Sequence, residues 1–148
     1  PPTTNPTPTN DNSKGTPTPI PPTPTHPPTS TPVEDPYCYL EMEAFDVTIE
    51  DGSQIVINEP FQKTWKLVNT GTCFWTPDFQ LVFISEEIMG GQSPVPLGTT
   101  VYPNKEIEIS VDLVAPAEAG PHIGYWQLQS PDSYSAGWLW VEIEAILP

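Results

Sequence analysis

The sequence has very little positive charge. Of its 148 residues only four are Lys or Arg, all of them Lys, against 19 Asp and Glu, so the formal net charge is −15 at pH 7. A surface that binds phosphate groups needs clustered Lys and Arg, and anionic membrane surfaces attract the same residues. The composition therefore excludes nucleic acid and anionic membranes as partners, and it is typical of a protein kept soluble by self-repulsion.

Long apolar runs are missing as well. No stretch approaches the ~18 consecutive apolar residues of a transmembrane helix, and no basic segment followed by an apolar one predicts a signal peptide. We therefore expect no direct insertion into a membrane. Because the sequence begins inside a low-complexity tract, we expect an upstream domain or anchor to precede it.

Residue types that carry catalysis or bind metals are scarce. His26 and His122 are the only histidines, and there is no Gly-x-Ser-x-Gly, His-Glu-x-x-His, Cys-x-x-Cys or acidic calcium loop. Paired carboxylates such as Glu106 and Glu108 fall on one outer strand face, where solvation is their ordinary role. We therefore expect no enzyme activity, no metal and no cofactor.

Two cysteines, Cys38 and Cys73, are present. An even number of cysteines in an acidic module with a Thr/Pro-rich tract favours a disulfide. Two reduced, buried thiols are the alternative.

Proline is unevenly distributed. Residues 1–36 hold 13 of the 22 prolines and 10 threonines but no aromatic residue. Such a segment buries too little apolar surface to offset the entropy of ordering, and its composition is typical of extracellular O-glycosylated stalks. We expect a disordered linker or stalk over residues 1–36 and an extracellular or cell-surface location.

Residues 37–148 are long enough for one domain with a real core and show the alternation of β-strands. Expected strands cover 45–50 and 54–57 as a hairpin around Asp51-Gly52, then 61–69, 81–84, 105–114, 123–129 and 139–146. About seven short strands without a helical period predict an all-β, Ig-like β-sandwich. The predicted core comprises Phe45, Val47, Ile49, Trp65, Leu67, Trp75, Leu81, Phe83, Ile107, Ile109, Val111, Leu113, Trp126, Leu128, Leu139, Val141 and Ile143.

All five tryptophans fall in this domain, and two of them have the wrong phase for the core. Leu139, Val141 and Ile143 form the inward phase of the last strand, so Trp138 and Trp140 point outward. An exposed aromatic patch usually marks an interface. We therefore take Trp138, Trp140, Tyr125 and Tyr134 as the candidate binding surface.

Several spaced motifs agree in order with a known family. The pattern F-x-K-x-W-x-L-x-N-x-G-T-C-x-W from Phe61, followed by V-x-L-x-A-P, G-Y-W-x-L and L-W-V-x-I, resembles the four-tryptophan (FW) Ig-like domain. This domain is known from the neighbour-of-BRCA autophagy receptors and from bacterial extracellular proteins with Thr/Pro-rich linkers. The resemblance implies that Trp65, Trp75, Trp126 and Trp140 are the family's mainly structural tryptophans.

Three functions fit these observations. The first is a non-catalytic protein- or peptide-interaction module presented on the stalk, which the resemblance to the receptors also favours. The second is a carbohydrate-binding module that stacks sugars on exposed aromatic rings. The third is a structural spacer without a ligand of its own.

Overall fold

The computed structural model describes residues 3–4, 19, 21–22 and 31–148, so most of the expected disordered linker, residues 1–36, lies outside the described residues. The chain divides into two units, Pro1–Pro32 and Val33–Pro148, and the second, here called the domain, contains both β-sheets. The domain thus includes four residues before the expected start at Tyr37. One of them is Glu34, whose carboxylate accepts a 2.7 Å hydrogen bond from the Phe74 backbone N–H.

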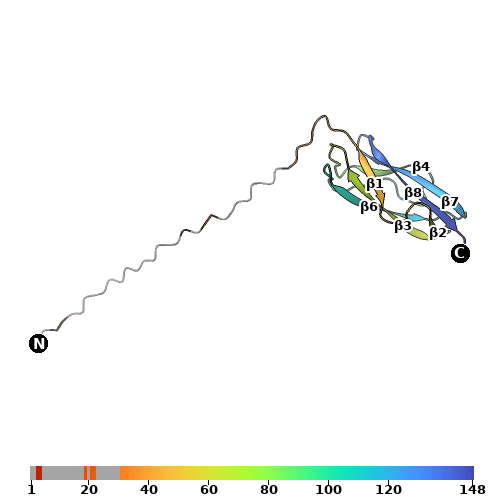
Figure 1. Cartoon of the computed structure of the whole chain (residues 1–148), viewed down its shortest axis with the longest axis horizontal. Helices are drawn as coiled ribbons and strands as arrows, with labels where there is room; N and C mark the ends of the chain where they lie inside the picture. Colours follow the sequence, from red (N-terminus) through yellow and green to blue (C-terminus); the bar gives the residue numbers. More distant parts are fainter. Residues whose placement is uncertain (1–2, 5–18, 20, 23–30) are drawn as a thin grey trace. The chain divides into compact units, whose positions relative to one another are not determined.

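Two β-sheets make up the domain (Figure 1). The three-stranded sheet has the order β1-β3-β6 and the five-stranded sheet the order β2-β8-β7-β4-β5. Neighbouring strands are antiparallel, except that β2 runs parallel to β8. The strands are β1 (Met42–Asp46), β2 (Ser53–Val56), β3 (Pro60–Asn69), β4 (Gln80–Glu86), β5 (Val95–Pro96), β6 (Glu106–Val114), β7 (Gly120–Gln129) and β8 (Ser135–Ile146).

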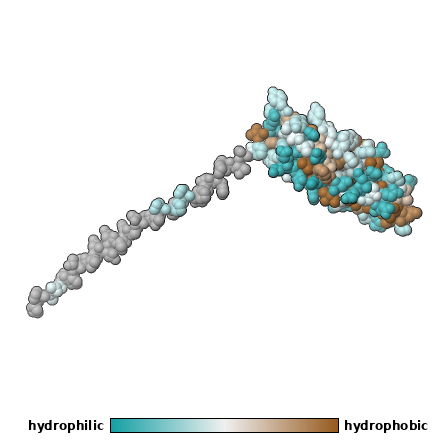
Figure 2. All heavy atoms as spheres, in the orientation of Figure 1, coloured by the Kyte–Doolittle hydropathy of each residue, from teal (hydrophilic) through white to brown (hydrophobic). Residues whose placement is uncertain are grey.

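The prediction of an all-β sandwich is confirmed, with eight strands in place of about seven. Among the described residues there is no helix that could span a membrane. On the face visible in Figure 2, hydrophilic residues surround separate hydrophobic patches of the domain.

The core lies between the two sheets and follows the alternation of the longer strands. Every second residue is buried from Ile109 onward in β6 and from Leu139 onward in β8, including Val111, Leu113 and Val141. Alternation is the natural pattern for a sheet with one face packed and one face in water. The inward phases predicted for these strands are therefore confirmed. Three predicted core residues, Ile49, Phe83 and Ile107, are only partly buried against the core.

A chain of aromatic rings crosses the core from one sheet to the other. Trp65 on β3 lies 6.4 Å from Trp126 on β7, measured between ring centroids, and Trp126 meets Phe83 on β4 edge to face at 5.5 Å. Trp65 also donates a 3.0 Å hydrogen bond from its indole Nε1 to the backbone oxygen of Trp140 on β8. β2 pairs with β8 only from Ile143 onward, so this oxygen is bound by the indole instead of by a neighbouring strand.

Two buried polar side chains of β3 tie loops to the core. Lys63 is fully buried, and its amine donates to the Asp46 carboxylate and to the backbone oxygen of Ile49. Asn69, also fully buried, donates to the backbone oxygens of Cys73 (2.9 Å) and Val101 (3.0 Å). These bonds satisfy groups that would be costly to bury alone, which explains the Lys and Asn of the sequence motif.

The hairpin expected around Asp51-Gly52 is wrong. β1 pairs with β3 in the three-stranded sheet, whereas β2 pairs with β8 in the other sheet, so the turn carries the chain across the sandwich. Phe45 and Val47, predicted to be core, are 46% and 47% exposed. Phe45 instead covers the amine of Lys66 at 4.9 Å from its ring centroid.

The connections supply core residues that alternation could not reveal. Phe79, Met89, Leu97 and Val101 are buried in the core although they lie outside the predicted strands. Val101 is held by a two-hydrogen-bond bridge to Trp75. The connection between β4 and β6 also contains the short edge strand β5.

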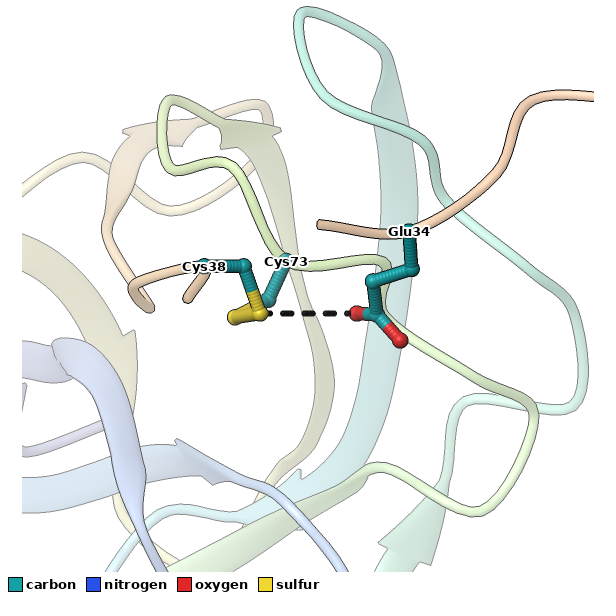
Figure 3. A group of neighbouring side chains, drawn as sticks. All are labelled: Glu34, Cys38 and Cys73. Carbon is teal, nitrogen blue, oxygen red and sulfur yellow. Dashed lines mark hydrogen bonds between the residues drawn. A yellow bond between two sulfur atoms is a disulfide. The ribbon is translucent and has the colours of Figure 1, made fainter. Parts of the chain in front are cut away.

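Cys38 and Cys73 form a disulfide (Figure 3). The Tyr39 backbone oxygen accepts hydrogen bonds from the N–H groups of Thr72 (3.0 Å) and Cys73 (3.1 Å), so the two segments lie side by side. Gly71 allows this approach, because a Cβ there would lie 2.5 Å from the Tyr39 oxygen. The bridge thus fixes the chain entering β1 to the turn after β3.

Reduction of the disulfide should destabilise the domain. The bridge closes a loop with a sequence separation of 35 residues, which the chain-entropy model values at about 4 kcal/mol. We expect a clear fall in the melting temperature when a reductant is added, measured by circular dichroism. A Cys38→Ser/Cys73→Ser variant, melted without reductant, should match the reduced protein, and an equal Tm for all three samples would contradict the expectation.

Trp65 should be the most costly tryptophan to truncate. Trp65→Ala removes a buried ring and the hydrogen bond between the sheets, for which we expect a loss of about 3–5 kcal/mol of unfolding free energy. Trp138→Ala, at an exposed position of β8, should cost less than about 1 kcal/mol. Urea denaturation measures both; a loss below about 1 kcal/mol for Trp65→Ala would show that the ring is not structural.

Candidate functional site

Three aromatic side chains gather on the outer face of the five-stranded sheet. Tyr125 on β7 pairs in register with Trp140 on β8, and Trp138 lies two residues earlier on the same face. Trp138 is 50% and Trp140 42% exposed, while Tyr125 is half-buried between them. Together with Ser85 of β4 they line a shallow depression. We call Tyr125, Trp138 and Trp140 the aromatic surface.

The rings of the aromatic surface are not coplanar. Tyr125 and Trp138 meet edge to face, with centroids 6.5 Å apart and an interplanar angle of 86°. Sugar rings stack best on aromatic faces that are aligned in one platform. The nearly perpendicular rings of Tyr125 and Trp138 instead suit a partner side chain that inserts between them.

Trp140 is held by hydrogen bonds at both its backbone and its side chain. Its backbone oxygen accepts the core hydrogen bond from Trp65, and its own indole Nε1 donates a 3.1 Å hydrogen bond to Asp51 Oδ2. The turn that carries Asp51 is in turn fixed to β8, because the Gly52 N–H donates to the Glu142 backbone oxygen at 3.0 Å. A ring held in this way loses little freedom when a partner binds.

A second depression adjoins the first and is more acidic. It is lined by Asp51, Ile123, Tyr125, Trp140 and Glu142, so Tyr125 and Trp140 belong to both. Asp51 and Glu142 were not among the residues predicted for the surface. The outward phase of β8 placed Glu142 beside Trp140, but nothing local to the sequence indicated that Asp51 would meet a strand 89 residues away.

Tyr134, the fourth predicted surface residue, does not join the others. It lies in the connection between β7 and β8, where its backbone N–H donates to Ser130 Oγ and its oxygen accepts from the Ser130 N–H. The side chain is 69% exposed and lines neither depression.

The tryptophans implied to be structural differ in exposure. Trp65, Trp75 and Trp126 are at most 1% exposed, in contrast to Trp140. The indole N–H groups of Trp75 and Trp126 have no hydrogen-bond partner in the described part of the chain. These two rings therefore contribute through apolar burial, whereas Trp65 also bonds across the sandwich.

One group of potential metal ligands occurs among residues 31–148, formed by Glu34, Cys38 and Cys73 (Figure 3). Glu34 Oε1 lies 3.7 Å from Cys38 Sγ. Metals bind thiolates, and both sulfurs are joined in the disulfide, so the cluster is a structural contact.

His122 sits in a carboxylate environment at the start of β7. Its Nδ1 contacts Glu87 Oε1 at 2.6 Å and its Nε2 contacts the Glu118 backbone oxygen at 2.8 Å. Both partners are acceptors, so only the imidazolium can donate to both. The hydrogen bond to Glu87 is the main cause that raises the pKa of His122 above 6.5, and it outweighs the opposing desolvation.

The sandwich and its buried tryptophans define an immunoglobulin-like domain, and comparison with known proteins identifies its family. The family model described as "Ig-like domain from next to BRCA1 gene" matches residues 48–145. The chain belongs to this family. The predicted resemblance and the Ig-like fold class are thereby confirmed.

Three relatives show how far the similarity extends. A protein NBR1 homolog of Arabidopsis thaliana is 31% identical over 110 residues, covering 69% of this chain and 15% of the relative. The protein JOKA2 of Solanum tuberosum is 30% identical over 108 residues, covering 69% and 12%. The protein ILRUN of Danio rerio is 32% identical over 83 residues, covering 56% and 29%. The chain thus spans less than a third of each of these relatives.

The stability of the domain should depend on pH through His122. Its pKa is raised in the folded state, so its contribution is fully present below about pH 6.5 and is lost as the pH rises through the folded-state pKa. We expect wild-type protein to lose more stability between pH 6 and pH 8 than a His122→Gln variant, measured by urea denaturation at each pH. Parallel pH profiles would show that the interaction contributes nothing.

Proposed function

We propose that this domain is a non-catalytic protein-interaction module, presented on the Thr/Pro-rich tract outside the cell or at the cell surface. The observation that carries the proposal is the aromatic surface. Large exposed aromatic side chains are enriched where proteins bind one another. Here two exposed tryptophans and the half-buried Tyr125 line one depression, and Trp140 is held by hydrogen bonds to both its backbone and its indole.

The geometry favours a protein partner over a sugar. The 86° angle between Tyr125 and Trp138 provides no common plane for a sugar ring. A spacer domain does not require exposed tryptophans, because exposed indoles promote non-specific association. Trp138 and Trp140 are nevertheless 50% and 42% exposed on one strand. Membership of a family that includes the NBR1 homologs supports the same class of function by analogy.

The extracellular location rests on two features of this chain. Disulfides persist in oxidising compartments and are rare in the cytosol, and Cys38 and Cys73 are joined. The Thr/Pro-rich composition of residues 1–36 is typical of extracellular stalks.

The experiment is an affinity capture with the immobilised full chain against a surface-protein extract and, in parallel, a polysaccharide panel. We expect protein to be retained by the wild type and reduced at least about tenfold by Trp138→Ala/Trp140→Ala, because truncating central aromatic anchors costs about 2 kcal/mol or more. Thermal melts check that the variant is folded.

The matched control is Tyr37→Ala/Tyr134→Ala, which removes two exposed aromatic rings that lie outside both depressions. It should retain protein as the wild type does. Equal losses for the two variants would contradict a specific surface. Retention of glycan alone would make the domain a carbohydrate-binding module, and retention of nothing would leave a spacer.

A further inference from the structure

The five-stranded sheet carries carboxylates but no Lys or Arg. Its strands β2, β4, β5, β7 and β8 contain no Lys or Arg, and His122 is their only basic residue. Lys63 and Lys66 both lie on β3 of the other sheet, where Lys63 is buried against Asp46. The acidic groups beside the aromatic surface therefore have no Lys or Arg on their own sheet to neutralise them.

Two of these acidic groups border the aromatic rings. Asp51 and Glu142 share a depression with Tyr125 and Trp140. The Asp51 carboxylate accepts a hydrogen bond from the Trp140 indole, but that donor is neutral and leaves the negative charge in place. The same bond fixes the carboxylate at the edge of the ring, so a charge and an aromatic face are presented together.

Aromatic faces beside carboxylates are suited to binding a basic side chain. Aromatic faces attract cations through the ring quadrupole, and carboxylates attract and hydrogen-bond the same cations. An anionic segment would be repelled by a domain of this charge, and an uncharged apolar segment would have to desolvate the carboxylates without compensation. A long basic side chain can cover the rings with its stem and place its charged end near the acids.

We propose that the aromatic surface, together with Asp51 and Glu142, binds a basic segment of the partner protein. An Arg or Lys side chain of that segment lies against Tyr125 and Trp140, with its charged end at the two carboxylates. This inference rests on the proposed function and names the chemistry of the partner for the same site.

The test follows the indole N–H signals of Trp138 and Trp140 by NMR in the full, 15N-labelled chain. The probe is a capped peptide, acetyl-Gly-Ser-Arg-Gly-Arg-Ser-Gly-amide, and its control carries citrulline in place of both arginines, which keeps the shape and removes the charge. We expect the arginine peptide to shift both indole signals and to bind about tenfold more tightly than the citrulline peptide. Raising the salt concentration should weaken the binding of the arginine peptide.

Two charge variants test whether the carboxylates of Asp51 and Glu142 are the groups that attract the arginine peptide. Asp51→Asn/Glu142→Gln keeps the hydrogen-bonding shape of both side chains and should weaken binding of the arginine peptide about tenfold. The matched control Glu43→Gln/Glu108→Gln removes the same charge from exposed positions of the three-stranded sheet and should stay within about twofold of the wild type.

Three results would overturn the inference: equal binding of the two peptides, equal effects of the two charge variants, or no shift of either indole signal at millimolar peptide. None of these would refute an interaction surface that Trp138→Ala/Trp140→Ala abolishes in the capture experiment. Conversely, a capture that ignores the tryptophans would refute the proposed function directly, so the two failures are distinguishable.

Discussion

The hydrogen bond from the Trp65 indole to the Trp140 backbone oxygen is the contact on which both the fold and the surface depend. It links β3 of one sheet to β8 of the other inside the apolar core, where an unpaired N–H or C=O would be costly. Because β2 begins to pair with β8 only at Ile143, the Trp140 oxygen would otherwise lack a partner strand. The bond therefore completes the core and, at the same residue, positions the outward-facing ring.

Two further buried polar side chains on β3 also bond backbone oxygens, in this case those of loops. Lys63 and Asn69 occupy the same inward phase as Trp65, and each reaches backbone oxygens of segments that the strands do not pair. In particular, Lys63 binds the oxygen of Ile49, a residue with a φ of 56°. The bond holds the chain where it leaves the three-stranded sheet and turns toward β2. The sequence motif thus encodes loop positions as well as a strand.

Alternation predicted the fold wherever a strand keeps one phase, and failed where the phase changes. On β8 the inward Leu139 and Val141 and the outward Trp138 and Trp140 follow directly from the pattern. Between Phe45 and Ile49 the apolar residues also alternate, but β1 turns Met42 and Ala44 inward, so Phe45 is in its outward phase. Irregular backbone after Asp46 then brings Ile49 back against the core. Nothing local distinguishes that break from a continuous strand, so Phe45 and Val47 were assigned to the core and β2 to the wrong sheet.

The aromatic residues of the candidate surface were predictable from the sequence, but its carboxylate Asp51 was not. Outward phase revealed Trp138 and Trp140, whereas Asp51 depends on the crossing between sheets that alternation missed. That crossing has a functional consequence. If Asp51-Gly52 had closed a hairpin with β1, its carboxylate would lie on the three-stranded sheet, and Trp140 would lack its indole acceptor. Since the turn instead docks on β8, an acidic group and a fixed ring face are placed together, and the topology of the sandwich determines the chemistry that its outer face presents.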